Sequence, residues 1–403
     1  MKTSKSSLEY FSITAITGRI SRFCKVVFAV FFLAVQSILG MDLAIAADVN
    51  TMTYEQAVRR IPGRKIPKFW IGDVAGLSGR FEKITKGKVR TIAISPGGRP
   101  MHLVTFGKKE KLEHKANFNS AIGGRELAAY MEKPARKKPV ILFAGPVHGA
   151  EVEALTGLVN FINVMESGKD LRGKSHVKLR ALGEQCRLLI IPGGNPDGIA
   201  RFEPRSLCGM EGNDLRFWGQ GTWSDDTFCG WPQSKRLHPM AGDDVGFLGC
   251  YFNDKGINPM HDEFFAPMGP EAPAILKVAA AEGPDLAVSL HSHENKPAVL
   301  RPAYVTVEIQ RDIRSLAERY YGILAERDLP HGGLFEVKSE GGGNPSPFNL
   351  TSALYHISGA GSFTFECPHG LKNGCRVSFE QILDIQLSLY EAMLRHEIEK
   401  KRP

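Results

Sequence analysis

Four short apolar runs predict the strands at the centre of the fold. They are Pro139–Ala144, Cys186–Ile191, Asp285–Leu290 and Ser362–Phe365, each bounded by turn residues or polar groups. Continuous apolar runs of this length are typical of strands buried on both faces, as in a parallel sheet. We therefore expect these four strands to form the interior of one sheet.

Helix and hairpin patterns accompany the four runs. Two β-rich runs between Val89 and Gly107 flank a Pro-Gly-Gly turn, which predicts a hairpin. Glu151–Met165 has apolar positions at helical spacing, and Thr306–Glu326 and Ser378–Lys400 are also predicted helices. A charged stretch, Lys108–Lys138, is interpreted as a surface insertion with one short helix. Strands that alternate with helices indicate an α/β fold.

Residues with metal-binding or proton-transfer chemistry stand just past three of the predicted strands. His148 and Glu151 are three apart at a strand-to-helix turn, His291 follows the third run, and Glu366 follows the fourth. Ligands bind at the carboxyl ends of strands in open α/β sheets. Zinc hydrolases keep three protein ligands and leave the fourth position to water. A carboxylate outside the ligand set then handles the protons.

Each of these residues also has an ordinary explanation. Glu151 in the first turn of a helix is favourable to the helix dipole, and His148 alone is a weak signal. Glu366 could face solvent or pair with His369, but a carboxylate among apolar neighbours has a raised pKa, which suits a base. Their occurrence together at several strand ends favours a site.

Neighbouring residues leave alternatives within the site. His293 could share a strand face with His291, and we choose His291 as the ligand because it directly ends the apolar run. Glu153 points away from Glu151 on a helix and is predicted to be solvated. Zinc-bound histidines usually donate their second N–H to a carboxylate or carbonyl, for which Asp197 and Glu294 are candidates.

The bulk composition is that of a globular protein and excludes one class of partner. The chain has 403 residues, of which 43% are hydrophobic and 23% charged, and its formal net charge is +8. No block of Lys and Arg with interleaved aromatic residues occurs, so nucleic-acid binding is not expected.

The amino terminus predicts an exported protein. A positively charged leader precedes the uncharged, mostly apolar run Val26–Gly40, and Ala44-Ile45-Ala46 follows as a cleavage site. The run is short for a membrane span, so we expect a signal peptide at residues 1–46 and no stable membrane association after cleavage. Because the leader is long, the alternatives are an uncleaved anchor or a start codon further in. We assign residues 47–87 to an amino-terminal extension and 88–403 to the catalytic domain. The mature protein would be periplasmic or secreted.

The cysteine content agrees with export. Cys24 falls in the predicted signal, and six cysteines remain, an even number that suggests disulfides in an exported chain. Cys367 and Cys375 bracket a short loop and are the favoured pair. The alternative is that some are buried free thiols, since cysteine packs well as a small apolar residue.

Five motifs in order resemble the carboxypeptidase A-like zinc metallocarboxypeptidase family, as a divergent bacterial-type member. The motifs are Ser95-Pro-Gly-Gly-Arg-Pro, Pro146-Val-His-Gly-Ala-Glu, Asn195-Pro-Asp-Gly, Leu290-His-Ser-His and Phe363-Thr-Phe-Glu. The resemblance covers roughly residues 88 to 400. It implies a three-layer fold with a central mixed, mostly parallel sheet flanked by helices.

The resemblance also implies roles for particular residues. One Zn²⁺ per chain is bound by His148, Glu151 and His291, and Glu366 is the general base. The family polarises the scissile carbonyl with an arginine downstream of Asn-Pro-Asp-Gly, and of Arg201 and Arg205 we favour Arg205. An arginine suits this role because its donors are fixed and always charged.

The chain departs from the family pattern where the substrate carboxylate is held. The family usually has Asp-Leu-Asn-Arg, whereas this chain has Gly-Asn-Asp-Leu-Arg-Phe at 212–217. Asn213 and Arg216 are the remaining candidates to bind a carboxylate. Tyr355 is the candidate for the family's mobile tyrosine, with a place in the core as the alternative.

These observations favour an exported zinc peptidase that acts on a peptide with a free carboxylate. Its exported location suggests a cell-wall peptide as substrate. A second interpretation is a zinc amidase or deacylase of N-acyl amino acids or cell-wall peptides, with aspartoacylase-like chemistry. A third is a non-catalytic binding protein on the same fold, which predicts loss of a ligand or of the base, and none is lost here.

Overall fold

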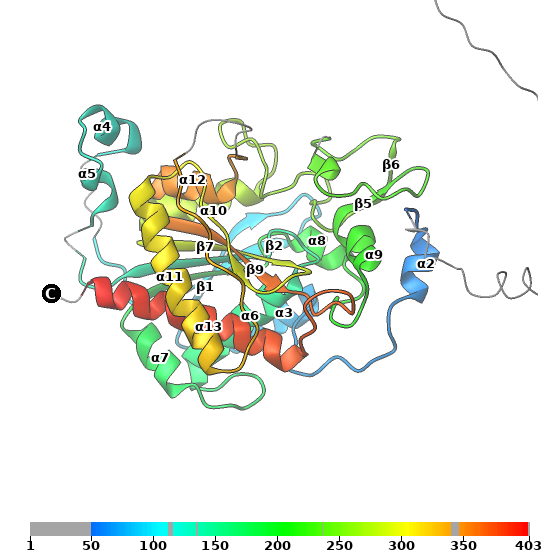
Figure 1. Cartoon of the computed structure of the whole chain (residues 1–403), viewed down its shortest axis with the longest axis horizontal. Helices are drawn as coiled ribbons and strands as arrows, with labels where there is room; N and C mark the ends of the chain where they lie inside the picture. The colour runs from blue at the N-terminus through cyan, green and yellow to red at the C-terminus, as the bar shows by residue number, and fades with distance from the viewer. Residues whose placement is uncertain (1–49, 112–115, 134–135, 236, 340–345, 402–403) are drawn as a thin grey trace, which may run out of the picture. The chain divides into compact units, whose positions relative to one another are not determined.

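A computed structural model describes residues 50–111, 116–133, 136–235, 237–339 and 346–401 (Figure 1). The predicted signal peptide and Cys24 lie outside these residues. Residues Asn50–Pro403 form one compact unit, and the predicted boundary at residue 88 stays a prediction. Among the described helices, none has the length and the apolar composition needed to cross a membrane.

The described residues contain a seven-stranded mixed sheet with the order β1-β2-β4-β3-β7-β9-β8. Its strands are β1 Lys88–Ile94, β2 Pro100–Phe106, β3 Val140–Gly145, β4 Arg187–Pro192, β7 Leu286–His293, β8 Ala298–Val299 and β9 Gly361–Pro368. The neighbours β4, β3, β7 and β9 are parallel, and the pairs that involve β1, β2 or β8 are antiparallel. This confirms the predicted α/β fold and the four predicted interior strands.

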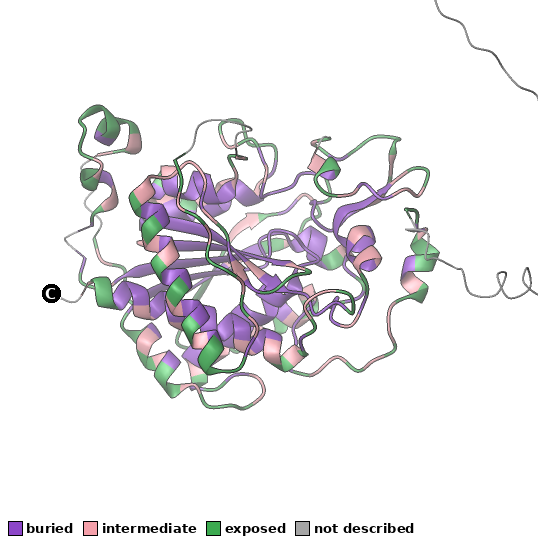
Figure 2. Ribbon diagram, in the orientation of Figure 1, coloured by how far each residue is buried: buried purple, intermediate pink, exposed green. Residues whose placement is uncertain are grey.

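Helices cover both faces of the sheet, which makes three layers (Figure 1). Alternate side chains of β3 face opposite ways: Ile141 and Phe143 belong to one core, Leu142 and Ala144 to the other. The first core includes α6 Val152–Ser167, α7 Val177–Glu184, α11 Val307–Glu326 and α13 Phe379–Lys400. The second includes α10 Glu271–Glu282 and α12 Leu350–Ser358. The central strands are accordingly buried along their length (Figure 2).

The remaining elements are short. They are α2 Tyr54–Arg59, α3 Val74–Phe81, α4 Phe118–Gly123, α5 Ala128–Met131, α8 Pro196–Arg201, α9 Gly212–Leu215, a π-helical turn Arg216–Gln220, a 3₁₀ turn Gln233–Lys235, and the two-stranded sheet of β5 Gly221–Trp223 and β6 Val245–Leu248. The predicted hairpin is confirmed as β1 and β2. Gly98 takes the left-handed φ of +77° that its turn requires.

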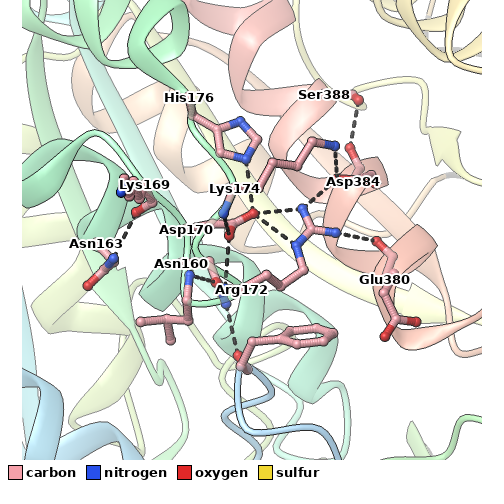
Figure 3. A network of polar contacts seen from close by, with 12 residues as sticks. Asn160, Asn163, Lys169, Asp170, Arg172, Lys174, His176, Glu380, Asp384 and Ser388 are labelled. Carbon is pink, nitrogen blue, oxygen red and sulfur yellow. Dashed lines mark hydrogen bonds and ion pairs between the residues drawn. The ribbon is translucent and has the colours of Figure 1, made fainter.

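A buried carboxylate organises the loop between α6 and α7 (Figure 3). Asp170 accepts hydrogen bonds from the Arg172 guanidinium at 2.7 and 2.9 Å, from His176 Nε2 at 2.9 Å, and from two loop amides. Arg172 also reaches Asp384 of α13 at 2.6 Å. Burial opposes ionisation of Asp170, but the bonds from Arg172 and His176 lower its pKa below the ordinary value. The network therefore fastens this loop to α13.

The predicted Cys367–Cys375 disulfide is wrong. All six cysteines among the described residues are free thiols. Cys367 lies in β9 and is fully buried in the core. Cys375 lies in a loop, and its backbone amide donates to the Glu294 carbonyl. The alternation of the strand thus turns the Cys367 side chain into the core. The alternative expectation, free cysteines that are mostly buried, describes the structure.

Candidate metal centre

The predicted site residues come from three neighbouring parallel strands. His148 lies in the turn after β3, Glu151 is the residue before α6, and His291 and Glu366 lie in β7 and β9. His291 pairs in register with Glu366, because the two strands stay paired as far as His293 and Pro368. The sequence pattern predicted both residues just past their strands, but the structure places both within them.

The turn that carries His148 is tightly packed against α8. A Cβ atom at Gly149 would lie 2.1 Å from the Gly198 carbonyl carbon, so only glycine fits there. The Gly149 amide donates to the Cys250 carbonyl at 2.7 Å. The backbone therefore fixes the direction in which His148 leaves the turn.

Three side chains converge as a metal-binding set. His148 Nδ1 lies 3.0 Å from Glu151 Oε1, His291 Nδ1 lies 2.9 Å from Glu151 Oε2, and the two Nδ1 atoms are 3.2 Å apart. A tetrahedral zinc with bonds of about 2.0–2.1 Å separates its ligand atoms by roughly 3.3 Å. All three side chains are buried, and no hydrogen bond to Glu151 Oε2 is found among the residues that the structure describes. The set fits Zn²⁺ and confirms that His148, Glu151 and His291 can bind one ion.

Other buried residues fix the orientation of both imidazoles. His148 Nε2 lies 3.2 Å from Asn258 Oδ1, and His291 Nε2 lies 3.0 Å from Ser289 Oγ. With these oxygens as acceptors, both Nδ1 atoms are free of hydrogen and face the ligand set. The Tyr251 ring stacks on His148 with a centroid distance of 4.0 Å and an interplanar angle of 11°.

The expected partners of the histidines are not the observed ones. Asp197 accepts from Ser95 Oγ at 2.5 Å and from Arg99 Nη1 at 2.8 Å, so it ties the β1–β2 hairpin to α8. His293 Nε2 lies 2.9 Å from the Lys296 carbonyl. Asn258 and Ser289 are the observed partners of the two ligand histidines, in place of the expected Asp197 and Glu294.

The two carboxylates of the site have opposite electrostatic environments. Burial raises the pKa of Glu151, but His148 and His291 outweigh it and lower the pKa well below its usual range. Glu366 is partly exposed to the cavity, yet the loss of surrounding water raises its pKa to about 8. Carboxylates whose pKa values diverge in this way serve different roles, here a charged ligand and a proton-transfer group.

A cavity of about 540 Å³ opens over these residues. It is lined by His148, Glu151, Gly212, Leu215, Arg216, Gln220, Trp231, Tyr251, His291, Ser292, His293, Glu294, Glu366, Leu371 and Asn373. The ligand set and Glu366 form its inner part. The segment from Gly212 to Gln220 contributes a wall that includes a cation, Arg216.

The structure brings only one of the predicted substrate-binding residues to the cavity, namely Arg216. Arg205 pairs with Asp73 at 2.5 Å, and Asn213 is not among the described lining residues. Arg201 donates to the carbonyls of Leu248, Gly249 and Phe252, and so holds the β6 end. Tyr355 is 1% exposed in α12 and belongs to the core.

The prediction that Glu153 is solvated is wrong. Its side chain is fully buried and pairs with His369, the Oε1 and Nδ1 atoms being 3.2 Å apart. Glu153 thus faces the loop after β9 and not water. The pair therefore links the start of α6 to the end of β9.

Several residues of the site were not found from the sequence. Tyr251, Trp231 and Gln220 come from the irregular segment between α8 and α10, where no periodic pattern indicates which side chains face the cavity. Ser289 could have been found, since alternation along a strand places residues 289 and 291 on one face.

Comparison with known proteins agrees with this geometry. Residues 79–294, more than half of the chain, match the model of the zinc carboxypeptidase family. A protein described as a carboxypeptidase A from Shewanella denitrificans OS-217 has a similar structure, with a TM-score of 0.50 and 14% sequence identity over 86% of this chain and 69% of that one. A metallo-carboxypeptidase from Burkholderia cenocepacia gives a TM-score of 0.49 and 16% identity, over 81% and 68%. No curated protein sequence matches the chain.

Proposed function

The chain belongs to the zinc carboxypeptidase family and is a metallopeptidase, and from this we propose that it removes the last residue of a peptide, with Glu366 as general base. The observation that carries the proposal is the pairing of His291 with Glu366 in adjacent parallel strands. This register sets the base directly beside a ligand of the metal set.

The chain's own residues supply the proton transfers. Bound zinc, held by His148, Glu151 and His291, would supply a Lewis acid that polarises the carbonyl and acidifies water. Glu366 takes a proton from the attacking water and delivers it to the leaving amine. The loss of surrounding water raises the pKa of Glu366 to about 8, which suits the delivery of the proton to the amine.

Arg216 anchors the substrate in this proposal. It is the one Arg or Lys among the described residues that line the cavity. A guanidinium binds a carboxylate with two parallel hydrogen bonds, which orients the terminal residue as well as attracting it. Arg205, the arginine predicted to polarise the scissile carbonyl, is left out of the assignment, because it pairs with Asp73 and does not line the cavity.

We further propose that the substrate is met outside the cytoplasm and is a cell-wall peptide. The charged leader and the apolar run of the first 46 residues support export. The polar lining of the cavity suits a peptide with charged groups, since Arg216 and Glu294 both line it.

The test is a product analysis by mass spectrometry. Purified protein is incubated with peptides that have either a free or an amidated carboxyl end, with muropeptides, and with N-acyl amino acids, each with and without a chelator. We expect chelator-sensitive loss of one residue from free peptides and at least tenfold slower cleavage of amidated ones. Equal cleavage of both would exclude Arg216 as a carboxylate anchor, and selective cleavage of N-acyl amino acids would establish the deacylase alternative.

A further inference from the structure

The first described residues of the chain lie along the segment that forms the cavity wall. We call residues 50–73 the N-terminal clamp. Thr51 forms an antiparallel bridge with Thr227, and the Met52 amide donates to the Asp226 carbonyl at 3.0 Å. The clamp thus begins at a single β-bridge to one end of residues 203–228.

The far end of the clamp is fixed to the other end of the same segment. Trp70 Nε1 donates to the Arg205 carbonyl at 2.8 Å, and Asp73 pairs with the Arg205 guanidinium at 2.5 Å. A Cβ atom at Gly72 would lie 2.1 Å from the Arg205 carbonyl oxygen, so the two backbones touch. Between the two ends, the Tyr54 hydroxyl donates to Glu203, and its ring packs against Trp218 and Phe247.

One clamp residue acts on the helix that leads directly to Arg216. Arg60 Nε lies 2.6 Å from Asp214 Oδ1 and its Nη2 lies 3.2 Å from Oδ2, a bidentate pair, and Nη2 also lies 3.0 Å from Glu211 Oε2. The Asp214 side chain is only 3% exposed. A buried carboxylate needs such a partner, because leaving its charge uncompensated is costly.

Asp214 lies two residues before Arg216 with no intervening loop. Helix α9 ends at Leu215, and the π-helical turn begins at Arg216. Asp214 also accepts from the Glu211 amide at 2.8 Å, so its carboxylate closes the first turn of α9. The position of Asp214 therefore sets the position from which the Arg216 side chain starts.

We propose that Arg60 is a positioning residue for the substrate-binding wall, and that the clamp orders this wall before substrate arrives. This rests on the proposed role of Arg216. His291 and Glu366 lie in strands of the sheet and His148 and Glu151 in the turn after β3, and none of them has a described side-chain contact to Arg60. The clamp therefore governs substrate binding and leaves metal binding alone. A wall ordered in advance saves the entropy that substrate would otherwise lose in ordering it.

The test compares Arg60→Ala with Arg59→Ala in the mature protein. Arg59 is the neighbouring residue, its Nε donates to the Glu55 carbonyl in its own helix, and its side chain is exposed. For Arg60→Ala we expect KM for a free-carboxylate peptide to rise about tenfold, with kcat within about twofold and unchanged zinc content. Arg60→Lys keeps the charge without the fork and should give an intermediate KM. Arg59→Ala should match the wild type.

Hydrogen exchange gives a second readout that needs no activity. Amides of residues 211–220 should exchange roughly tenfold faster in Arg60→Ala, while those of β7 and β9 stay protected. An unchanged KM with unchanged exchange would overturn the proposal, and so would a joint loss of kcat, zinc and thermal stability. If Arg60→Ala does not fold, Asp214→Asn and Arg60→Lys decide by the same measures. If the wild type cleaves no peptide, the proposed function fails. The hydrogen-exchange data alone then decide whether the clamp orders residues 211–220.

Discussion

Removing the Ser289 hydroxyl should weaken metal binding without touching a ligand. Ser289 is fully buried in β7, and its Oγ lies 3.0 Å from His291 Nε2. In Ser289→Ala, the Nε2–H of His291 loses its acceptor in a site that is only 2% exposed. An unsatisfied buried donor costs about 1–3 kcal/mol. Because this cost is borne by the orientation in which His291 binds the metal, zinc affinity should drop by roughly 10- to 100-fold, the range typical for loss of the hydrogen-bond partner of a metal-binding histidine.

The assay is a zinc competition titration against a chromogenic chelator. Ser362→Ala is the matched control, because Ser362 is an equally buried serine one strand along, and its hydroxyl donates to the Thr351 carbonyl at 2.7 Å. The control should bind zinc like the wild type. Equal affinities in Ser289→Ala and Ser362→Ala, with both proteins folded, would refute the view that Ser289 orients His291.

Three further predictions concern proton transfer, selectivity and stability. Glu366→Gln should keep one zinc per chain by elemental analysis and lose at least about a thousandfold in kcat, whereas substantial residual turnover would exclude it as the base. Glu294 lines the cavity, so its charge should affect which side chain is accepted beside the scissile bond. In paired peptide assays, Glu294→Lys should raise kcat/KM for a peptide with glutamate there relative to one with lysine, by about two- to fivefold. An unchanged ratio would show that the charge of Glu294 lies too far from the substrate to act on it. Asp170→Asn should lower the free energy of unfolding by about 2–3 kcal/mol at pH 7 in urea titrations. The pKa of Asp170 in the folded protein lies below its ordinary value of 3.8, so its stabilisation is present above pH 3.8 and is lost as the pH falls through the folded pKa. The free energies of unfolding of wild type and variant should therefore converge in acid. A difference that stays constant with pH would contradict the assigned network.

The parts of the fold that the sequence predicted are those with a local signature. The interior strands could be found because strands buried on both faces need continuous apolar runs. The ligands could be found because His148 and Glu151 flank a strand-to-helix turn and His291 ends an apolar run. Each of these signals depends on only a few consecutive residues.

The substrate-binding wall could not be predicted in the same way. Residues 203–250 form short, irregular elements, and which side chain reaches the cavity depends on contacts with distant residues. Arg205 pairs with Asp73, and Asp214 in the helix just before Arg216 pairs with Arg60. Both partners come from a segment more than a hundred residues earlier in the chain, a relation that no periodicity indicates.

Burial of charge was the other source of error. Glu153 follows a helical pattern that predicted solvent, but a loop from the end of β9 covers it and supplies His369. Cys367 illustrates the same limit, because the loop spacing to Cys375 suggested a bridge while the strand direction places the thiol in the core. The cover over Glu153 comes from a distant part of the chain, whereas the direction of Cys367 follows from alternation along a strand that was predicted to end at Phe365 but continues to Pro368.

The sheet order has a consequence for which forms of the chain can be active. The three ligands occupy positions 148 to 291, but Glu366 comes from β9, which lies between β7 and β8 in the sheet and is the last strand along the described residues. A chain shortened before β9 would keep the three ligand residues but would lack both the proposed base and the strand that pairs with β7. The proposed activity therefore requires the completed sheet, and no shortened form of the chain could carry it.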